Sequence, residues 1–196
     1  MKSDILILAG IAVLGAVPAS AARFTVRPGF DDNRVVFSSK APMESFEGKT
    51  GQVQGSLEFD PAALGDSVTF EFEVDLASLD TGLALRNKHM RENHLQTAKY
   101  PKAVFRGGGV TDASGSTLNP GETVTLALTG TFDLHGVSRR ISMPVKATRR
   151  ADGALGIVAR FPVPLSEYNI DRPKFLVMKL DEIQQVTVTL TALPQP

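Results

Sequence analysis

The most constraining feature of this sequence is an alternation of apolar and polar residues with a period of two, which recurs from residue 34 onward. In residues 68–75 four apolar positions alternate with threonine or acidic positions, and residues 123–135 extend the same pattern over thirteen positions. Successive side chains of a strand point to opposite faces, so the pattern predicts strands with one face in a core and one in water, as in antiparallel sheets. Eight strands are predicted, at 34–40, 52–59, 68–75, 102–105, 123–135, 141–147, 155–163 and 186–192.

Turn-forming residues separate these strands. They occur at Asp60-Pro61, Gly107-Gly108-Gly109, Asn119-Pro120-Gly121, His135-Gly136 and Asp152-Gly153. Each pair or triplet fits a hairpin position, and His135 is expected to serve the geometry of a tight turn. The fold class is therefore all-β, an antiparallel barrel or sandwich, and a closed barrel leaves no strand edge exposed. An eight-stranded barrel can pack its own interior or hold one small ligand.

One segment, residues 83–95, breaks the period of two. Leu83, Asn87, Met90 and His94 fall on one stripe at helical spacing, and Asp80 and Thr81 precede it as possible caps. We expect a short helical segment across one end of the barrel. It is either a plug that completes the core or a lid over a cavity, and the sequence does not choose between them.

Residues 1–22 have the pattern of a cleaved secretory signal. Lys2 is followed by an apolar run over residues 5–17 and by small residues at 18–22. A transmembrane anchor needs roughly 20 apolar residues, which this run does not reach. Cleavage after Ala21 or after Ala22 is equally compatible with the pattern. We expect residues 23–196 to form one exported domain, periplasmic or extracellular, with no stable membrane span.

Composition excludes several kinds of chemistry. The chain has 21 basic and 21 acidic residues, no cysteine and three histidines. The balanced charge argues against a nucleic-acid partner, and the missing thiols exclude disulfides and cysteine metal sites. His89 and His94 are five residues apart and diverge by roughly 140° on an α-helix, so they are not expected to form a metal pair. We predict no catalytic residue, metal or cofactor.

Six sequence blocks follow one another along the chain: RVVF at 34–37, VQGSLEFDP at 53–61, DLASLDTG at 75–82, RNKHM at 86–90, KYPKAVF at 99–105 and LTGTFDLHGVSR at 128–139. In this order and spacing they resemble the YceI-like family of lipocalin-like periplasmic proteins that bind polyisoprenoid lipids. The resemblance implies an eight-stranded lipocalin-like barrel with a helical segment at one end and an apolar cavity for an isoprenoid chain. The family commonly has Asp where this chain has Asn87, and Leu where it has Met90.

An isoprenoid tail is a branched hydrocarbon, so a cavity that binds it must be long and apolar. Inward Gly55, Gly130 and Ala159 are expected to leave room in the lumen. The apolar candidates, chosen by parity, are Phe37, Leu57, Phe59, Phe70, Phe72, Leu126, Leu128, Phe132, Met143, Phe161 and Val163, with Met90 from the helical segment. The polar candidates, expected at the mouth, are Arg86, Asn87, His89, His94, Tyr100 and Lys174. Any apolar candidate could instead be ordinary core, and the polar ones a solvated face.

The leading hypothesis is a non-enzymatic protein that carries or stores an isoprenoid quinone or a polyprenyl phosphate; a homodimer is also compatible. Two alternatives stay open. The first is a hydrolase or isomerase of such lipids, for which Asp133 and His135 are the available carboxylate–histidine pair. The second is a filled barrel that acts through its surface.

Overall fold

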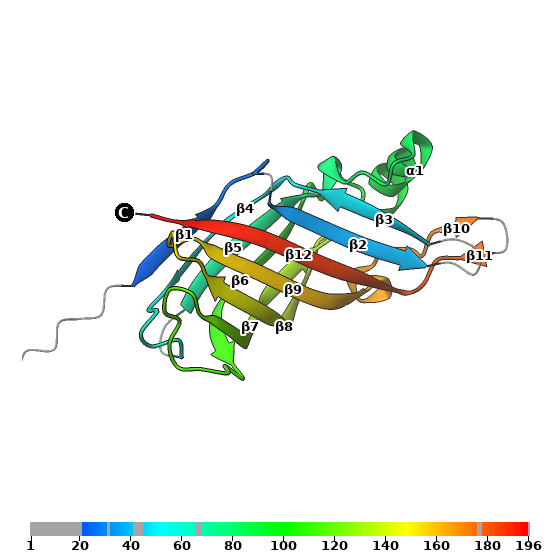
Figure 1. Ribbon diagram of the computed structural model, residues 1–196. Coiled ribbons are helices and arrows are strands. Elements are labelled where there is room, and N and C mark those ends of the chain that lie inside the picture. The colour runs from blue at the N-terminus through cyan, green and yellow to red at the C-terminus, as the bar shows by residue number, and fades with distance from the viewer. Residues whose placement is uncertain (1–20, 31, 41–44, 66–67, 176–177, 196) are drawn as a thin grey trace, which may run out of the picture.

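The computed structural model describes residues 21–30, 32–40, 45–65, 68–175 and 178–195 (Figure 1). The signal predicted at residues 1–22 lies outside the described residues, apart from Ala21 and Ala22.

Ten strands form one antiparallel sheet that closes on itself. The ring runs through β1 (Ala22–Val26), β4 (Val53–Phe59), β5 (Val68–Asp75), β6 (Lys102–Thr111), β7 (Thr123–Leu134), β8 (Val137–Arg149), β9 (Leu155–Pro164) and β12 (Ile183–Pro194). Pairing of β1 with the end of β12 closes the barrel, so the described residues form a closed eight-stranded antiparallel barrel as expected. A separate two-stranded hairpin joins β10 (Lys174–Phe175) to β11 (Met178–Lys179).

Two positions of the ring are each built from two consecutive strands. β12 pairs with β2 (Arg34–Lys40) along its first half and with β1 at its end. In the same way β1 pairs with β4, while β2 pairs with β3 (Ser45–Thr50). One edge of β3 pairs with β2. The described residues pair with its other edge only through an isolated β-bridge between Lys49 and Asp80, and no strand continues the sheet there. The wall is therefore incomplete beside β3, at the end of the barrel where the helical segment lies (Figure 1).

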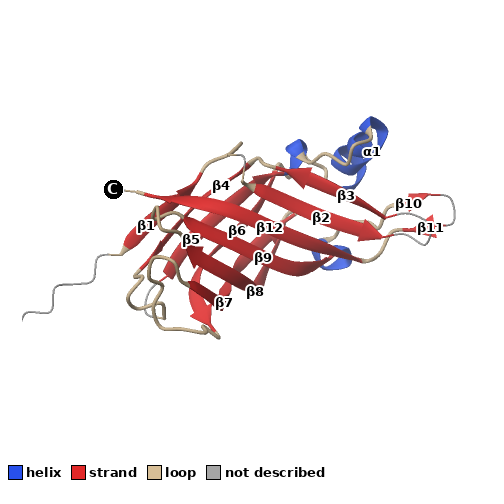
Figure 2. Ribbon diagram, in the orientation of Figure 1, coloured by secondary structure: helices blue, strands red, loops and turns tan. Residues whose placement is uncertain are grey.

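The helical segment predicted at 83–95 is present in two forms. An α-helix, α1 (Ala84–His89), continues into a π-helical turn, η2 (Met90–His94), closed by the bond from the Leu95 amide to the Met90 carbonyl. Short 3₁₀ turns occur at η1 (Leu76–Ser78) and η3 (Leu165–Tyr168). Figure 2 shows the helices gathered at one end of the barrel, away from the end where the C-terminus lies.

Most predicted turns are confirmed, and one is wrong. His135 and Gly136 have φ angles of 51° and 77° and join β7 to β8 as a two-residue hairpin. The glycine triplet 107–109 does not form a turn. It lies inside β6, where the register with β7 shifts between Gly107 and Gly109. A β-bulge uses glycine for the same conformational freedom that a turn requires, so composition alone does not separate the two.

The end of the barrel opposite α1 is filled by apolar side chains. Phe24 of β1 stacks on Phe59 of β4 with ring centroids 5.4 Å apart. Leu64 and Leu118 lie in two loops over this end, and both are almost fully buried. The two loops are hydrogen-bonded to each other, because the Leu64 amide donates to the carbonyl of residue 116 and the Leu118 amide donates to the carbonyl of residue 61. The interior is therefore closed at this end.

Candidate ligand-binding cavity

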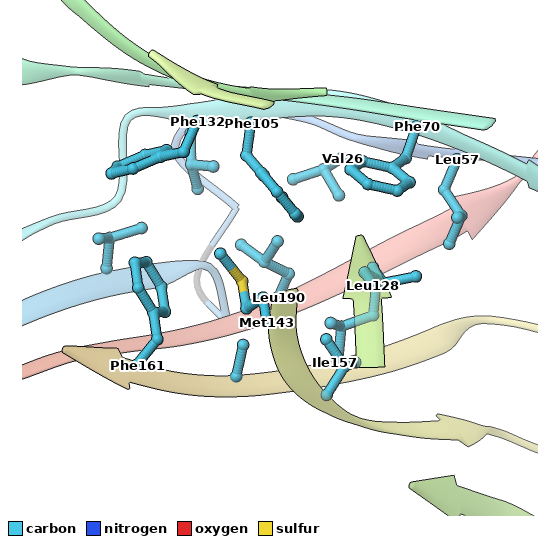
Figure 3. Packing of buried hydrophobic residues seen from close by; sticks show 14 of the residues in the cluster. Val26, Leu57, Phe70, Phe105, Leu128, Phe132, Met143, Ile157, Phe161 and Leu190 are labelled. Carbon is cyan, nitrogen blue, oxygen red and sulfur yellow. The ribbon is translucent and has the colours of Figure 1, made fainter. Parts of the chain in front are cut away.

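The other half of the interior is an apolar cavity of about 870 Å³. Its wall takes side chains from every position of the ring, including Phe72 of β5, Phe132 of β7, Phe161 of β9 and Val188 of β12. Figure 3 shows Phe132 and Phe105 on one wall facing Phe161 and Met143 on the other. The volume is large for a ligand pocket, for which about 300–1,000 Å³ is usual.

The inner end of the cavity is an aromatic floor. Phe105 lines the cavity, and Phe70 packs against Phe105 on the side toward the closed end, with ring centroids 4.8 Å apart. Val53 and Leu190 also line the cavity and are almost fully buried. The cavity therefore ends about where the packed core begins.

Eleven of the eighteen candidate residues lie on the cavity wall. They are Phe37, Phe72, Arg86, His89, Met90, His94, Leu128, Phe132, Met143, Phe161 and Val163. The residues on strands were predicted from the alternation of apolar and polar positions, and those between 86 and 94 from the helical segment.

Four apolar candidates, Leu57, Phe59, Phe70 and Leu126, are buried but do not line the cavity. They face inward, as their parity predicts, in the closed half of the barrel. Parity identifies the inner face of a strand and carries no information on how far along the barrel a residue lies.

The glycines expected to widen the lumen have a different role. A Cβ atom on Gly55 would collide with Phe72 and with the Glu71 carbonyl, and one on Gly130 would collide with the Arg106 carbonyl. Neither glycine lines the cavity. Their lack of a side chain allows the neighbouring strand and a phenylalanine ring to pack directly against the glycine backbone. Ala159, in contrast, does line the cavity.

The cavity reaches the surface beside α1. Leu83 and Leu85 line it, yet 55% and 67% of their surfaces are exposed. Met90 and Leu95 pack against the core from the same segment. One part of this segment therefore completes the core. The other part forms a rim of two exposed leucines and four polar residues, which we call the mouth (Thr81, Leu83, Leu85, Arg86, His89 and His94).

Arg86 is held at the mouth by neighbouring groups. Its Nε donates to the Thr81 hydroxyl at 3.0 Å, and an Nη donates to the Thr81 carbonyl at 2.9 Å. Its guanidinium lies 4.1 Å from the centre of the Phe46 ring of β3. This cation–π contact links the helical segment to β3.

Asn87, predicted to contact a ligand, instead anchors the helical segment from outside the cavity. Its Oδ1 accepts bonds from the Thr81 amide at 2.8 Å and the Thr81 hydroxyl at 2.7 Å. Its Nδ2 donates to Asp80 at 2.7 Å, and this bond is the main reason that the pKa of Asp80 is lowered. An amide fits here because it accepts on one side and donates on the other.

The π-turn brings His89 and His94 together on the cavity wall. On a regular α-helix two residues five apart diverge, but an i→i+5 turn places them on nearly the same side. The His94 Nδ1 lies 3.0 Å from the Asp171 carbonyl. Burial lowers the pKa of His94, because the charged imidazolium loses hydration there.

Besides Thr81 at the mouth, two buried polar wall residues were not predicted from the sequence. Ser39 of β2 and Gln184 of β12 line the cavity and are buried. A signal was available, because Ser39 shares the parity of Val35 and Phe37, and Gln184 shares that of Val186.

Other polar candidates lie elsewhere. Tyr100 packs against His135, with ring centroids 4.6 Å apart, and does not line the cavity. The Lys174 side chain is outside the described residues. Asp133 pairs with Arg106 and Ser138, while the His135 Nδ1 lies 3.0 Å from the Tyr168 carbonyl, so these two residues do not form the pair considered above.

Two kinds of feature are absent from the described residues. No group of three or more histidine, aspartate or glutamate side chains is placed to hold a metal ion. No helix among them is long and apolar enough to cross a membrane.

A family model described as the YceI-like domain matches residues 24–192. The chain belongs to the YceI-like family. The match includes all the barrel strands in whole or in part, so the family and the fold expected from the sequence are both confirmed. Among curated proteins no sequence matches this chain.

Solved structures resemble this YceI-like barrel in fold. BcnA of Burkholderia cenocepacia is 19% identical with a TM-score of 0.69, over 81% of this chain and 95% of its own. A polyisoprenoid binding domain from Saccharophagus degradans is 16% identical with a TM-score of 0.68, over 90% of this chain and 100% of its own. A YceI protein of Campylobacter jejuni is 16% identical with a TM-score of 0.52, over 100% of this chain and 99% of its own.

Proposed function

We propose that this YceI-like protein is a non-enzymatic carrier or store that holds a polyisoprenoid lipid in its barrel cavity. The observation that carries the proposal is the cavity of about 870 Å³, lined mainly by aliphatic and aromatic side chains and closed by an aromatic floor. Each methylene that moves from water into such a space contributes roughly 0.8 kcal/mol. A flexible hydrocarbon with few polar atoms is the ligand class that this wall favours.

Three further points support the proposal. The cavity argues against the filled barrel, which requires an occluded interior. Asp133 and His135 have separate partners, which weakens the hydrolase or isomerase alternative. The structural neighbour from Saccharophagus degradans is described as a polyisoprenoid binding domain, which agrees with a lipid occupant.

A filling substitution on the cavity wall tests the proposal. In Ala159→Phe the new ring points into the cavity, and it should weaken binding of an isoprenoid quinone by at least about tenfold, since it displaces on the order of two methylenes of ligand. Val158→Phe places the same ring on the outer face of the same strand and serves as the control. Affinity is measured by titrating quinone into the detergent-free protein and measuring the bound fraction by its absorbance. Equal affinities of the two variants would contradict the proposal.

We also propose that the predicted signal directs export of the protein to the periplasm or the cell exterior and is then cleaved. Ala22 is the first residue of β1 and pairs with Phe59. Cleavage after Ala21 keeps this strand whole, so intact-mass measurement of the exported protein should give a chain that begins at Ala22. The homodimer stays a prediction, for which sedimentation of the same sample is the test.

A further inference from the structure

The hydroxyl of Ser39 is an unexplained polar group in the wall of the cavity. Ser39 is 1% exposed and lines the cavity, yet its Oγ has no hydrogen-bond partner in the described part of the chain. A hydroxyl removed from water without a partner destabilises the folded protein. Serine is therefore costly at this position unless a group from outside the chain satisfies it.

Gln184 provides a second polar group from the neighbouring strand. β2 and β12 are paired in register through Ser38 and Gln185, so Ser39 and Gln184 follow one step along the ladder and face inward together. Gln184 is 7% exposed, and its Nε2 donates to the Asp181 carbonyl at 2.7 Å. This bond orients the amide, and within the described residues the side chain makes no other hydrogen bond, which leaves Oε1 and one N–H for a ligand.

The position suits the polar end of a lipid whose tail lies deeper. Ser39 is the last residue but one of β2, and Gln184 is the second residue of β12. In Figure 1 these strand ends lie at the end of the barrel that carries the β10–β11 hairpin, away from the closed end. A chain that runs from this point to the floor at Phe105 lies along the apolar wall.

The electrostatics of the wall favour an uncharged ligand group. Ser39 and Gln184 carry no charge, and burial favours the neutral form of His94. Arg86 already donates to Thr81 and lies over Phe46 at the mouth. Ser39 is the register partner of Phe46, so this guanidinium, already engaged, lies near Ser39. A phosphate beside Ser39 and Gln184 would lose its hydration against two neutral side chains, whereas a carbonyl or hydroxyl oxygen would gain a donor.

We propose that Ser39 and Gln184 form a hydrogen-bonding subsite for an uncharged oxygen of the bound lipid, either a quinone carbonyl or an alcohol hydroxyl. The cavity consequently selects neutral isoprenoids over isoprenyl phosphates. This inference rests on the proposed function, because it takes an isoprenoid as the occupant.

The test uses four probes that share one tail of four isoprene units: a naphthoquinone, the free alcohol, the monophosphate and the plain hydrocarbon. Wild-type protein should bind the quinone and the alcohol more tightly than the phosphate. In Ser39→Ala the affinity for quinone and alcohol should fall by about 5- to 50-fold, the usual range for a lost buried hydrogen bond, while that for the hydrocarbon stays within about twofold. Ser39→Thr keeps the hydroxyl and should retain most of the affinity.

Two controls separate this subsite from a general structural effect. Ser39→Ala should leave the melting temperature of the lipid-free protein unchanged or raise it, because it removes an unpartnered buried hydroxyl. Ser38→Ala changes the adjacent residue, whose hydroxyl points outward to Glu47, and should bind all four probes as the wild type does.

The outcomes distinguish this inference from the proposed function. If all probes bind and Ser39→Ala changes no affinity, the subsite is wrong while the lipid carrier stands. If the phosphate binds most tightly, the selection for neutral isoprenoids is wrong. If the wild type binds none of the four, including the hydrocarbon, the proposed function fails and the subsite fails with it.

Discussion

Phe70 and Phe72 lie on the same face of β5, and their surroundings differ. Phe70 is buried against Phe105 and over the close approach of Gly107 and Gly130. Phe72 lines the cavity and is only partly buried. Two residues with the same parity thus belong to the core and to the cavity wall respectively.

This difference predicts unequal costs of truncation. Phe70→Ala should lower the free energy of unfolding by about 3–5 kcal/mol, as for a phenylalanine in a packed core. Phe72→Ala should cost clearly less, because part of its ring already borders open space. Urea unfolding of the lipid-free protein measures both values. Equal losses would show that the cavity is not open next to β5.

His94 should make stability depend on pH. Because the pKa of His94 is lowered in the folded protein, the unfolded chain binds the proton more readily, and stability rises with pH. This contribution is fully present above the unfolded value near 6.5 and is lost as pH falls through the folded pKa. His94→Gln should therefore lose less stability than the wild type between pH 7.5 and pH 5. Parallel melting-temperature curves over this range would contradict the assignment.

At the scale of elements, the segment from η1 to η2 depends on Asn87 for its attachment. The Asn87 amide joins Asp80 and Thr81, which lie three to four residues before the start of α1. A carboxylate at this position could still accept from Thr81 but could not donate to Asp80.

Asn87→Asp should consequently destabilise the segment at neutral pH, where it places two carboxylates beside each other. The melting temperature should fall, and the fall should shrink on acidification toward pH 4, when one carboxyl can hold a proton and donate again. Asn87→Ala, which removes both bonds without adding charge, is the control and should show little pH dependence of its own. An Asn87→Asp effect that does not change with pH would contradict the proposed contact with Asp80.

The elements were largely predictable because alternation over seven or more residues is a strong signal. Strands β5, β7 and β9 appear within one residue of the expected bounds. β1 and β3 were missed, since they are short and β3 carries Glu47 and Lys49 among small residues. The π-helical turn η2 was also not predictable, because the apolar spacing of residues 83–95 is that expected of an ordinary α-helix.

At the scale of the whole molecule, the limits of prediction concern depth along the barrel. The inner face was identified correctly for the long alternating strands, but Leu57, Phe59, Phe70 and Leu126 lie in the closed half. Depth depends on the register between strands and on how the ring closes, which no single strand encodes. Ser39 and Gln184 were overlooked because only apolar residues were sought on the inner face.

The whole barrel divides into a packed half and a hollow half. The packed half, with Phe24, Phe59 and Leu118, supplies stability without disulfides, as the absence of cysteine requires. The hollow half can then remain open beside α1 without loss of the fold. This division explains how one set of alternating strands provides both a core and a container.

The central claim, that the hollow half holds an isoprenoid, is tested most directly by the lipid that copurifies with the protein. Protein purified without detergent is extracted with organic solvent, and the extract is analysed by mass spectrometry and quantified against protein. We predict a stoichiometric isoprenoid with a neutral head group, which is depleted in Ala159→Phe. Repeated extractions that yield no isoprenoid, together with no binding of added isoprenoid quinone, would contradict the claim.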